Sequence, residues 1–134
     1  SKRDSAAAGE RVAARGGKIH YFCVGRVLEQ ADVSWLKRLA EQGHPIGNHT
    51  YDHVYVLAKT HAEVQFRFQR APWLIGDRTP DELIEENVRL ATLAIESRLG
   101  IQPRGFRTPG GFATGLHDRA DVQAMLLRQG FPWV

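Results

Sequence analysis

Three of the six histidines lie within ten residues, in the stretch GHPIGNHTYDH (residues 43–53). His49 and His53 are separated by three residues. This spacing lets two imidazoles converge on one metal ion, on a helical turn or in a curled loop. Neutral imidazole is the commonest protein ligand for zinc and also suits other transition metals. The stretch is therefore a candidate divalent metal site, with His49 and His53 as two of its ligands.

The residues around the pair leave a second interpretation open. Asn48 and Thr50 can hydrogen-bond the loop into shape, Asp52 is a candidate for orienting one of the rings, and His44 is a further candidate ligand. A catalytic metal also needs a third protein ligand and an open position for water. In the structural alternative, His49 bonds a backbone carbonyl and its partner histidine is a partly exposed loop residue.

A second polar and glycine-rich stretch, FRTPGG (residues 106–111), occurs later in the chain. Pro109 fixes its own φ and disfavours the helical region for Thr108, while the glycines permit tight backbone angles. Arg107 stands directly before this turn, and its planar guanidinium can bridge carboxylates in a way that lysine cannot copy. The alternative is a surface arginine paired with a nearby carboxylate such as Asp118.

The elements that must position these residues alternate along the chain. Helical patterns cover residues 5–18, 31–43, 60–70, 79–100 and 118–130, and β-type or extended runs cover 19–25, 44–48, the start of 103–115, and 131–134. In the longest helix Thr79 and Glu82 form a capping box and Gly100 ends the run. This alternation predicts an α/β fold with a largely parallel sheet. Loops after parallel strands gather at one edge, so we expect His49 and Arg107 to face each other.

Composition limits the classes of function. The 134 residues suit one domain, and 43% hydrophobic with 25% charged residues is ordinary for a globular protein. A net charge of +3, scattered along the chain, does not indicate a nucleic-acid partner. The single cysteine, Cys23, permits no internal disulfide and is expected to be buried. No transmembrane run or signal peptide is visible in these residues, and localisation stays open between cytoplasm and cell envelope.

Three motifs together resemble those of the polysaccharide deacetylases, the family 4 carbohydrate esterases with a NodB homology domain. GHPIGNHTYDH is similar to their metal motif, His-Ser/Thr-x-x-His after a Gly-His-x-Ile-Gly-Asn strand. FRTPGG is similar to the Arg-x-Pro motif that walls their catalytic groove, and IHYFCVG (residues 19–25) to a Thr-Phe-Phe-hydrophobic-x-Gly strand. The order and spacing of all three agree with the family, and the resemblance spans roughly residues 10–134.

The resemblance implies part of a distorted (β/α) barrel that removes N-acetyl or O-acetyl groups from a chitin-like or peptidoglycan-like glycan, as in the bacterial cell wall. It implies one divalent metal, usually zinc, a carboxylate base and a histidine acid. His49 and His53 would be metal ligands. In the catalytic loop, Arg107 would hold the catalytic carboxylate, and Gly110, directly after Pro109, would offer its N–H to the oxyanion. Many relatives have an aromatic residue at the Gly110–Gly111 position, which implies a more open groove wall here.

The chain departs from the family pattern toward both ends. The Thr-Phe-Asp-Asp motif, which supplies the base and third metal ligand, and the late Asp-x-x-Asp-Trp and Leu-x-His motifs are absent from the sequence. Residues 1–134 are therefore expected to form an internal segment, a partial deacetylase domain with both ends of the barrel missing and no useful activity alone. The alternatives are a non-catalytic carbohydrate-binding or structural relative and, among hydrolases, a cyclic-amide hydrolase.

Overall fold

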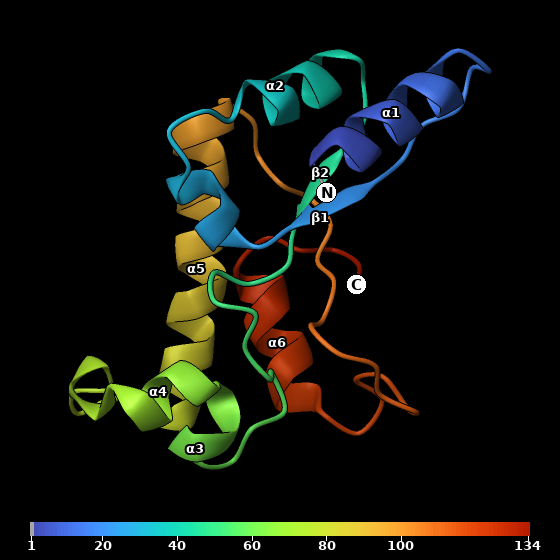
Figure 1. The fold of residues 1–134 in the computed structure, drawn as a ribbon. Coiled ribbons are helices and arrows are strands. Elements are labelled where there is room, and N and C mark those ends of the chain that lie inside the picture. Colours follow the sequence, from blue (N-terminus) through green and yellow to red (C-terminus); the bar gives the residue numbers. More distant parts are fainter. Residues whose placement is uncertain (1) are drawn as a thin grey trace.

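Helices alternate with short extended segments throughout residues 2–134, the part of the chain that the computed structural model describes (Figure 1). The elements, with η for 3-10 helices, are α1 (Lys2–Ala13), β1 (Tyr21–Cys23), η1 (Gly25–Glu29), α2 (Ser34–Glu41), β2 (Ile46–Asn48), α3 (His61–Val64), α4 (Phe66–Arg70), η2 (Pro72–Leu74), α5 (Pro80–Leu99) and α6 (Ala120–Arg128). Through β2 this order follows the alternation that the sequence predicts, whereas in the described residues α6 follows α5 with no strand between them.

The extended segments lie side by side and run parallel. β1 and β2 pair along all three of their residues. Single parallel bridges then join Asn48 to Phe106 and Gly105 to Trp133. The four extended runs predicted from the sequence therefore meet in the expected direction. Within the described residues, however, two of them form only isolated bridges, so the strands predicted at the start of 103–115 and at 131–134 are wrong in extent.

The long helix α5 connects two apolar clusters. Thr79 caps its first turn in a complete capping box with Glu82, and Gly100 ends the helix with a left-handed φ of 69°. Val88 lies in a cluster that also contains residues of α6, while Ile95 lies in a second cluster with residues of β1, β2 and α2. In Figure 1, α5 runs from the α2 end to the α3 and α4 end of the molecule. It is therefore the element against which the loops between the strands pack.

Some predicted boundaries differ from the structure. The helix expected over residues 60–70 is two helices, α3 and α4, separated at Gln65, whose backbone is extended (φ −167°, ψ 142°). Thr60 makes no side-chain cap, and the Glu63 carboxylate instead accepts a hydrogen bond from the Lys59 N–H. The strand expected over 19–25 is shorter because the chain turns into η1 at Gly25. None of the helices within residues 2–134 has the length and apolar character needed to cross a membrane.

Candidate functional site

The two histidines of the H-x-x-x-H stretch meet on the loop that follows β2. The ring centroids of His49 and His53 are 4.9 Å apart, and the rings are inclined by 70°. His49 Nδ1 lies 2.7 Å from the backbone carbonyl oxygen of Arg107, which can only accept a hydrogen bond. Nδ1 therefore carries the proton, and Nε2 keeps its lone pair. The expected approach of the stretches around His49 and Arg107 is present.

The loop that carries the histidines is strained. Thr50 and His53 have φ values of 61° and 59°, in the left-handed region that residues other than glycine rarely adopt. Such conformations cost about 1–3 kcal/mol each and persist only where the surroundings impose them. Asn48 Oδ1 accepts the Thr50 N–H at 2.8 Å, and Thr50 Oγ1 accepts the Val54 N–H at 3.0 Å. As predicted, Asn48 and Thr50 thus shape the loop.

Hydrogen bonds to helix α5 hold the same loop in place. Asn87 Oδ1 accepts the N–H groups of Tyr51 and Asp52 at 2.9 and 2.8 Å. Asn87 Nδ2 donates to an Asp52 carboxylate oxygen at 3.0 Å. Asn48 Nδ2 donates in turn to the Val88 carbonyl at 2.8 Å. Asn87 is not among the site residues predicted from the sequence, although an asparagine on the apolar face of a predicted helix is a usable signal because buried polar groups need partners.

Asp52 was a candidate for orienting a histidine ring and His44 for binding the metal, but both side chains have other roles in the structure. The Asp52 carboxylate is buried and pairs with Arg67 at 2.6 Å as well as with Asn87, so the prediction that it orients a histidine ring is wrong. His44 is 1% exposed and lies against α1. Its Nδ1 accepts the N–H of residue 19 and its Nε2 bonds the carbonyl of residue 9, both at 3.1 Å. Both ring nitrogens are therefore occupied, and His44 is not a metal ligand.

His49 and His53 fit a metal site as part of a ligand set. The His49 ring is oriented by a backbone carbonyl, the arrangement that fixes the tautomer of many metal-bound histidines. Burial lowers the pKa of His49, the hydrogen bond to Arg107 opposes this shift, and the neighbouring His53 adds to it. The His53 ring makes no hydrogen bond within residues 2–134. No group of three or more His, Cys, Asp or Glu side chains able to hold a metal occurs there either.

Arg107 stands at the end of the third extended segment. Its N–H donates to the Asn48 carbonyl at 3.0 Å, and its guanidinium carbon lies 5.8 Å from the centroid of the Phe22 ring. Among the residues that the structure describes it forms no ion pair. Asp118 instead lies 3.8 Å from His117, so the alternative of an Arg107–Asp118 pair is wrong. The exposed guanidinium is free to take a carboxylate from elsewhere.

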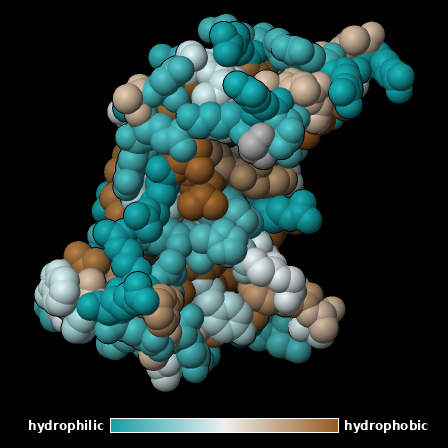
Figure 2. Space-filling view, in the orientation of Figure 1, coloured by the Kyte–Doolittle hydropathy of each residue, from teal (hydrophilic) through white to brown (hydrophobic). Residues whose placement is uncertain are grey.

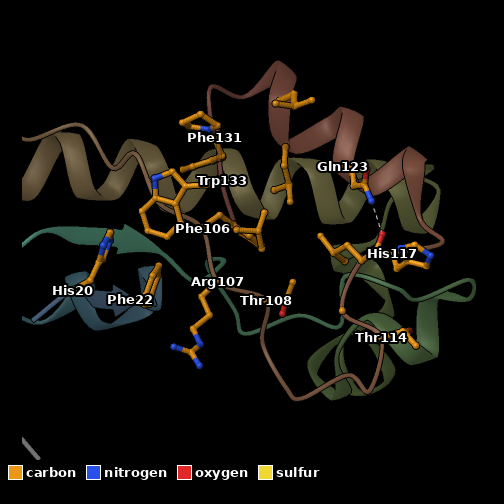
Figure 3. Close-up of a pocket in the computed structure, with 16 residues that line it drawn as sticks. His20, Phe22, Phe106, Arg107, Thr108, Thr114, His117, Gln123, Phe131 and Trp133 are labelled. Carbon is orange, nitrogen blue, oxygen red and sulfur yellow. Dashed lines mark hydrogen bonds between the residues drawn. The ribbon is translucent and has the colours of Figure 1, made fainter.

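Two hollows flank the site. Arg107 lines a cavity of about 920 Å³ together with His20, Phe22 and Trp133 (Figure 3). Trp133 is 47% exposed. The buried His20 Nε2 makes no hydrogen bond, and burial lowers the pKa of this imidazole. The second hollow, of about 410 Å³, lies between His53 and the turn after Arg107, where Pro109 is buried and Gly110 has φ 82°.

Comparison with known proteins identifies the family. Residues 10–126 match the family model of the polysaccharide deacetylases. The chain therefore belongs to the polysaccharide deacetylase family. No match was found among curated protein sequences.

Solved structures of family 4 esterases share the fold. A family 4 carbohydrate esterase from Streptomyces lividans, solved in complex with acetate, is 17% identical with a TM-score of 0.63, covering 100% of this chain and 55% of its own. IcaB from Ammonifex degensii is 20% identical with a TM-score of 0.63, covering 92% and 50%. A family 4 pseudoenzyme from Bacillus anthracis is 17% identical with a TM-score of 0.63, covering 94% and 36%. The α/β class is confirmed, and the chain spans about a third to a half of these structures.

Proposed function

We propose that the chain is the central part of a metal-dependent deacetylase that removes acetyl groups from an N-acetylated or O-acetylated polysaccharide. Residues 1–134 are a partial domain of a distorted (β/α) barrel in this proposal. The observation that carries it is the hydrogen bond from His49 to the Arg107 carbonyl, which joins the histidine pair to the arginine loop in a member of the polysaccharide deacetylase family.

Each site residue has a role in this proposal. His49 and His53 hold the metal, which we take to be zinc and which, when bound, supplies a Lewis acid. Arg107 directs its exposed guanidinium toward the carboxylate that serves as base and keeps the pKa of that group low. Gly110 offers its N–H to the developing oxyanion, and Pro109 fixes the turn that aims it. We assign the base, the third metal ligand and the acid histidine to chain outside these residues.

The substrate is an acetylated glycan of chitin-like or peptidoglycan-like type. The family supports this class of substrate, and acetate is present in the Streptomyces lividans esterase of the same fold. A non-catalytic, carbohydrate-binding role is the second candidate, because the Bacillus anthracis protein of the same fold is a pseudoenzyme. The strained loop that carries the histidines supports the enzyme, because strained backbone held by buried asparagines is typical of functional sites.

The metal assignment is tested by elemental analysis. The complete protein, purified after growth with zinc, is expected to hold about one metal per chain, and a His49→Ala, His53→Ala double variant is expected to lose it. The exposed His117, which lies on another loop, gives the matched control: His117→Ala keeps the metal. Full metal retention in the double variant would contradict the assignment. Acetate release from acetylated chito-oligosaccharide by the complete protein then separates the enzyme from the non-catalytic alternative.

A further inference from the structure

The short helix η1, which follows β1, holds the histidine loop through backbone hydrogen bonds. The Gly25 N–H donates to the Thr50 carbonyl at 3.0 Å, and the Arg26 N–H donates to the Tyr51 carbonyl at 3.1 Å. Both donors lie beyond the last residue of β1 that pairs with β2. The hydrogen bonds between the two segments therefore continue past the strands and reach the residues between the two histidines.

Gly25 has no room for a side chain. A Cβ built on it would lie 2.3 Å from Tyr51 Cδ2 and 3.0 Å from both Cα and Cε2 of the same residue. The shortest of these contacts would have to lengthen by about 1 Å to reach the ordinary van der Waals range, which begins at 3.4 Å. Gly25 is not one of the residues with a positive φ. Glycine is therefore required here by the close approach of Tyr51 and not by the backbone angle.

Tyr51 is held both at its backbone and at the end of its ring. Its hydroxyl donates to the Glu29 carboxylate, also in η1, at 2.6 Å. Its N–H donates to the backbone carbonyl of Asn87 at 3.1 Å and to the side-chain oxygen of the same residue at 2.9 Å. A methyl group added at Gly25 would therefore either break the bond to Glu29 or displace the backbone midway between the two histidines.

The backbone that would be displaced belongs to the strained part of the loop. Thr50 and His53, the neighbours of this segment on either side, have φ values of 61° and 59°. Such conformations persist only where the surroundings impose them. The imidazole rings of His49 and His53, whose centroids are 4.9 Å apart, are carried by this same loop. Contact with η1 is thus one of the restraints that set the direction of the two rings.

We infer that Gly25 and Tyr51 are positioning residues of the proposed metal site, because the Tyr51 ring occupies the place of the missing Gly25 side chain and thereby fixes the His49–His53 pair. This inference rests on the proposed function. Both residues act through the loop backbone, since glycine has no ligating group and the Tyr51 hydroxyl is bonded to Glu29. A binding constellation tolerates errors of about 0.5 Å in its geometry. A methyl group that demands a shift of about 1 Å exceeds that tolerance.

The test is the zinc affinity of the complete protein, measured by competitive titration. Gly25→Ala is expected to weaken zinc binding about 10–100-fold, as the loss of outer-shell support does at other metal sites. Tyr51→Ala is expected to weaken it less, and it makes room for a methyl group at position 25. The double variant Gly25→Ala, Tyr51→Ala should therefore bind zinc at least about threefold more tightly than Gly25→Ala, because residues in direct contact have coupled effects.

Gly9→Ala is the matched control for loss of stability. Gly9 is buried in α1, and a Cβ built on it would lie 2.6 Å from Leu39 Cδ2 in α2. This substitution adds the same methyl group to a similarly crowded place that is not part of the histidine loop. It should lower the midpoint of denaturant unfolding and leave the zinc affinity unchanged.

Two further measurements keep the test decisive. In the metal-free protein, the imidazole ¹⁵N signals of His49 and His53 should move in Gly25→Ala and stay in place in Gly9→Ala. Tyr51→Phe adds no volume and removes only the bond to Glu29, so it should fold and weaken zinc binding about threefold. If Gly25→Ala does not fold, wild-type zinc affinity in Tyr51→Phe would overturn the inference.

The outcomes separate this inference from the proposed function. If the protein binds zinc and releases acetate, but Gly25→Ala keeps the wild-type affinity or the double variant binds no more tightly than Gly25→Ala, the positioning role is wrong and the function stands. If the wild-type protein binds no zinc and releases no acetate, the proposed function is wrong. Movement of the His49 and His53 signals in metal-free Gly25→Ala would then still support the positioning role, and unmoved signals would overturn it.

Discussion

At the residue scale, His49 shows how a local pattern becomes a site. Its spacing from His53 predicts a ring pair, and the structure supplies the pair together with the Arg107 carbonyl that selects the His49 tautomer. The sequence indicated a contact with this carbonyl only through the expectation that the loops of His49 and Arg107 meet. The bond to the carbonyl is the one that the structural alternative describes, and metal binding through the other ring nitrogen stays a prediction.

Arg107 gives a prediction at this scale. In the complete enzyme, Arg107→Lys is expected to lower kcat at least about tenfold, because lysine cannot make the bidentate contact that orients the base. The exposed side chain contributes little to folding, so the melting temperature should hardly change. The acidic limb of the pH–rate profile should move to higher pH, since a base that loses the guanidinium has a higher pKa. Steady-state kinetics across pH measure both effects.

The control for this change is Arg104→Lys, because Arg104 is also exposed and lies three residues earlier in the chain. It is expected to leave kcat and the acidic limb unaltered. An unchanged kcat and an unchanged limb in Arg107→Lys would make Arg107 a surface residue without a catalytic role.

Cys23 gives a second prediction. Its side chain is buried in β1, and burial raises the pKa of the thiol to about 11 from an ordinary value of 9.0. The native state therefore favours the protonated form, and this contribution to stability is present below about pH 9 and is lost as pH rises through 11. Ellman's reagent should react slowly with the folded protein at pH 8 and rapidly in denaturant. Rapid labelling without denaturant would show that β1 opens easily.

At the element scale, helices were predictable because their signals are local. The capping box and the terminal glycine of α5 are read from neighbouring residues and are present as expected. The helix predicted over residues 60–70 divides at Gln65, whose side chain accepts the Arg67 N–H and donates to the Asp52 carbonyl at 3.2 Å. The bond to Asp52 joins residues remote in sequence, so local patterns could not predict the division. Strand lengths failed for the same reason: the bridges at Phe106 and Trp133 depend on partners remote in sequence.

Helix α5 gives a prediction about how an element holds the site. Asn87→Ala removes the acceptor of the Asp52 N–H and one of the two acceptors of the Tyr51 N–H, which keeps its bond to the Asn87 backbone carbonyl, and an unsatisfied buried donor costs about 1–3 kcal/mol in unfolding free energy. The loop then loses its imposed conformation, and zinc affinity should fall about 10–100-fold, as for outer-shell groups elsewhere. Denaturant unfolding and competitive zinc titration of the complete protein measure the two quantities.

A matched variant separates positioning from general destabilisation. Thr79→Ala removes the cap of the same helix and should cost about 1 kcal/mol in unfolding free energy without a change in zinc affinity. If Asn87→Ala and Thr79→Ala show the same zinc affinity, α5 supports the fold only and does not position the histidines.

At the scale of the whole molecule, the site lies between two apolar clusters, and one side of it is open. On the face drawn in Figure 2, polar side chains prevail over both ends of the molecule, and apolar side chains show in the hollow between them. The cavity beside Arg107 exposes Phe22 and Trp133, whose rings lie 6.2 Å apart at centroids. Local sequence patterns could not predict this openness, because it depends on how the four parallel segments are arranged in space and on which parts of the protein cover them.

The openness leads to a prediction about activity of residues 1–134 alone. General acid and base groups are each worth about 10²–10⁴ in rate, and their effects do not add independently. Within residues 2–134 the histidine pair has no third His, Cys, Asp or Glu ligand, so the metal itself is expected to bind weakly. The isolated 134-residue chain should therefore release acetate from acetylated chito-oligosaccharide no faster than buffer containing zinc. The complete protein, assayed in parallel, provides the positive control. Turnover by the isolated chain near that of the complete protein would mean that base, acid and third ligand all lie within it, and that the assignment of these groups to other parts of the barrel is wrong.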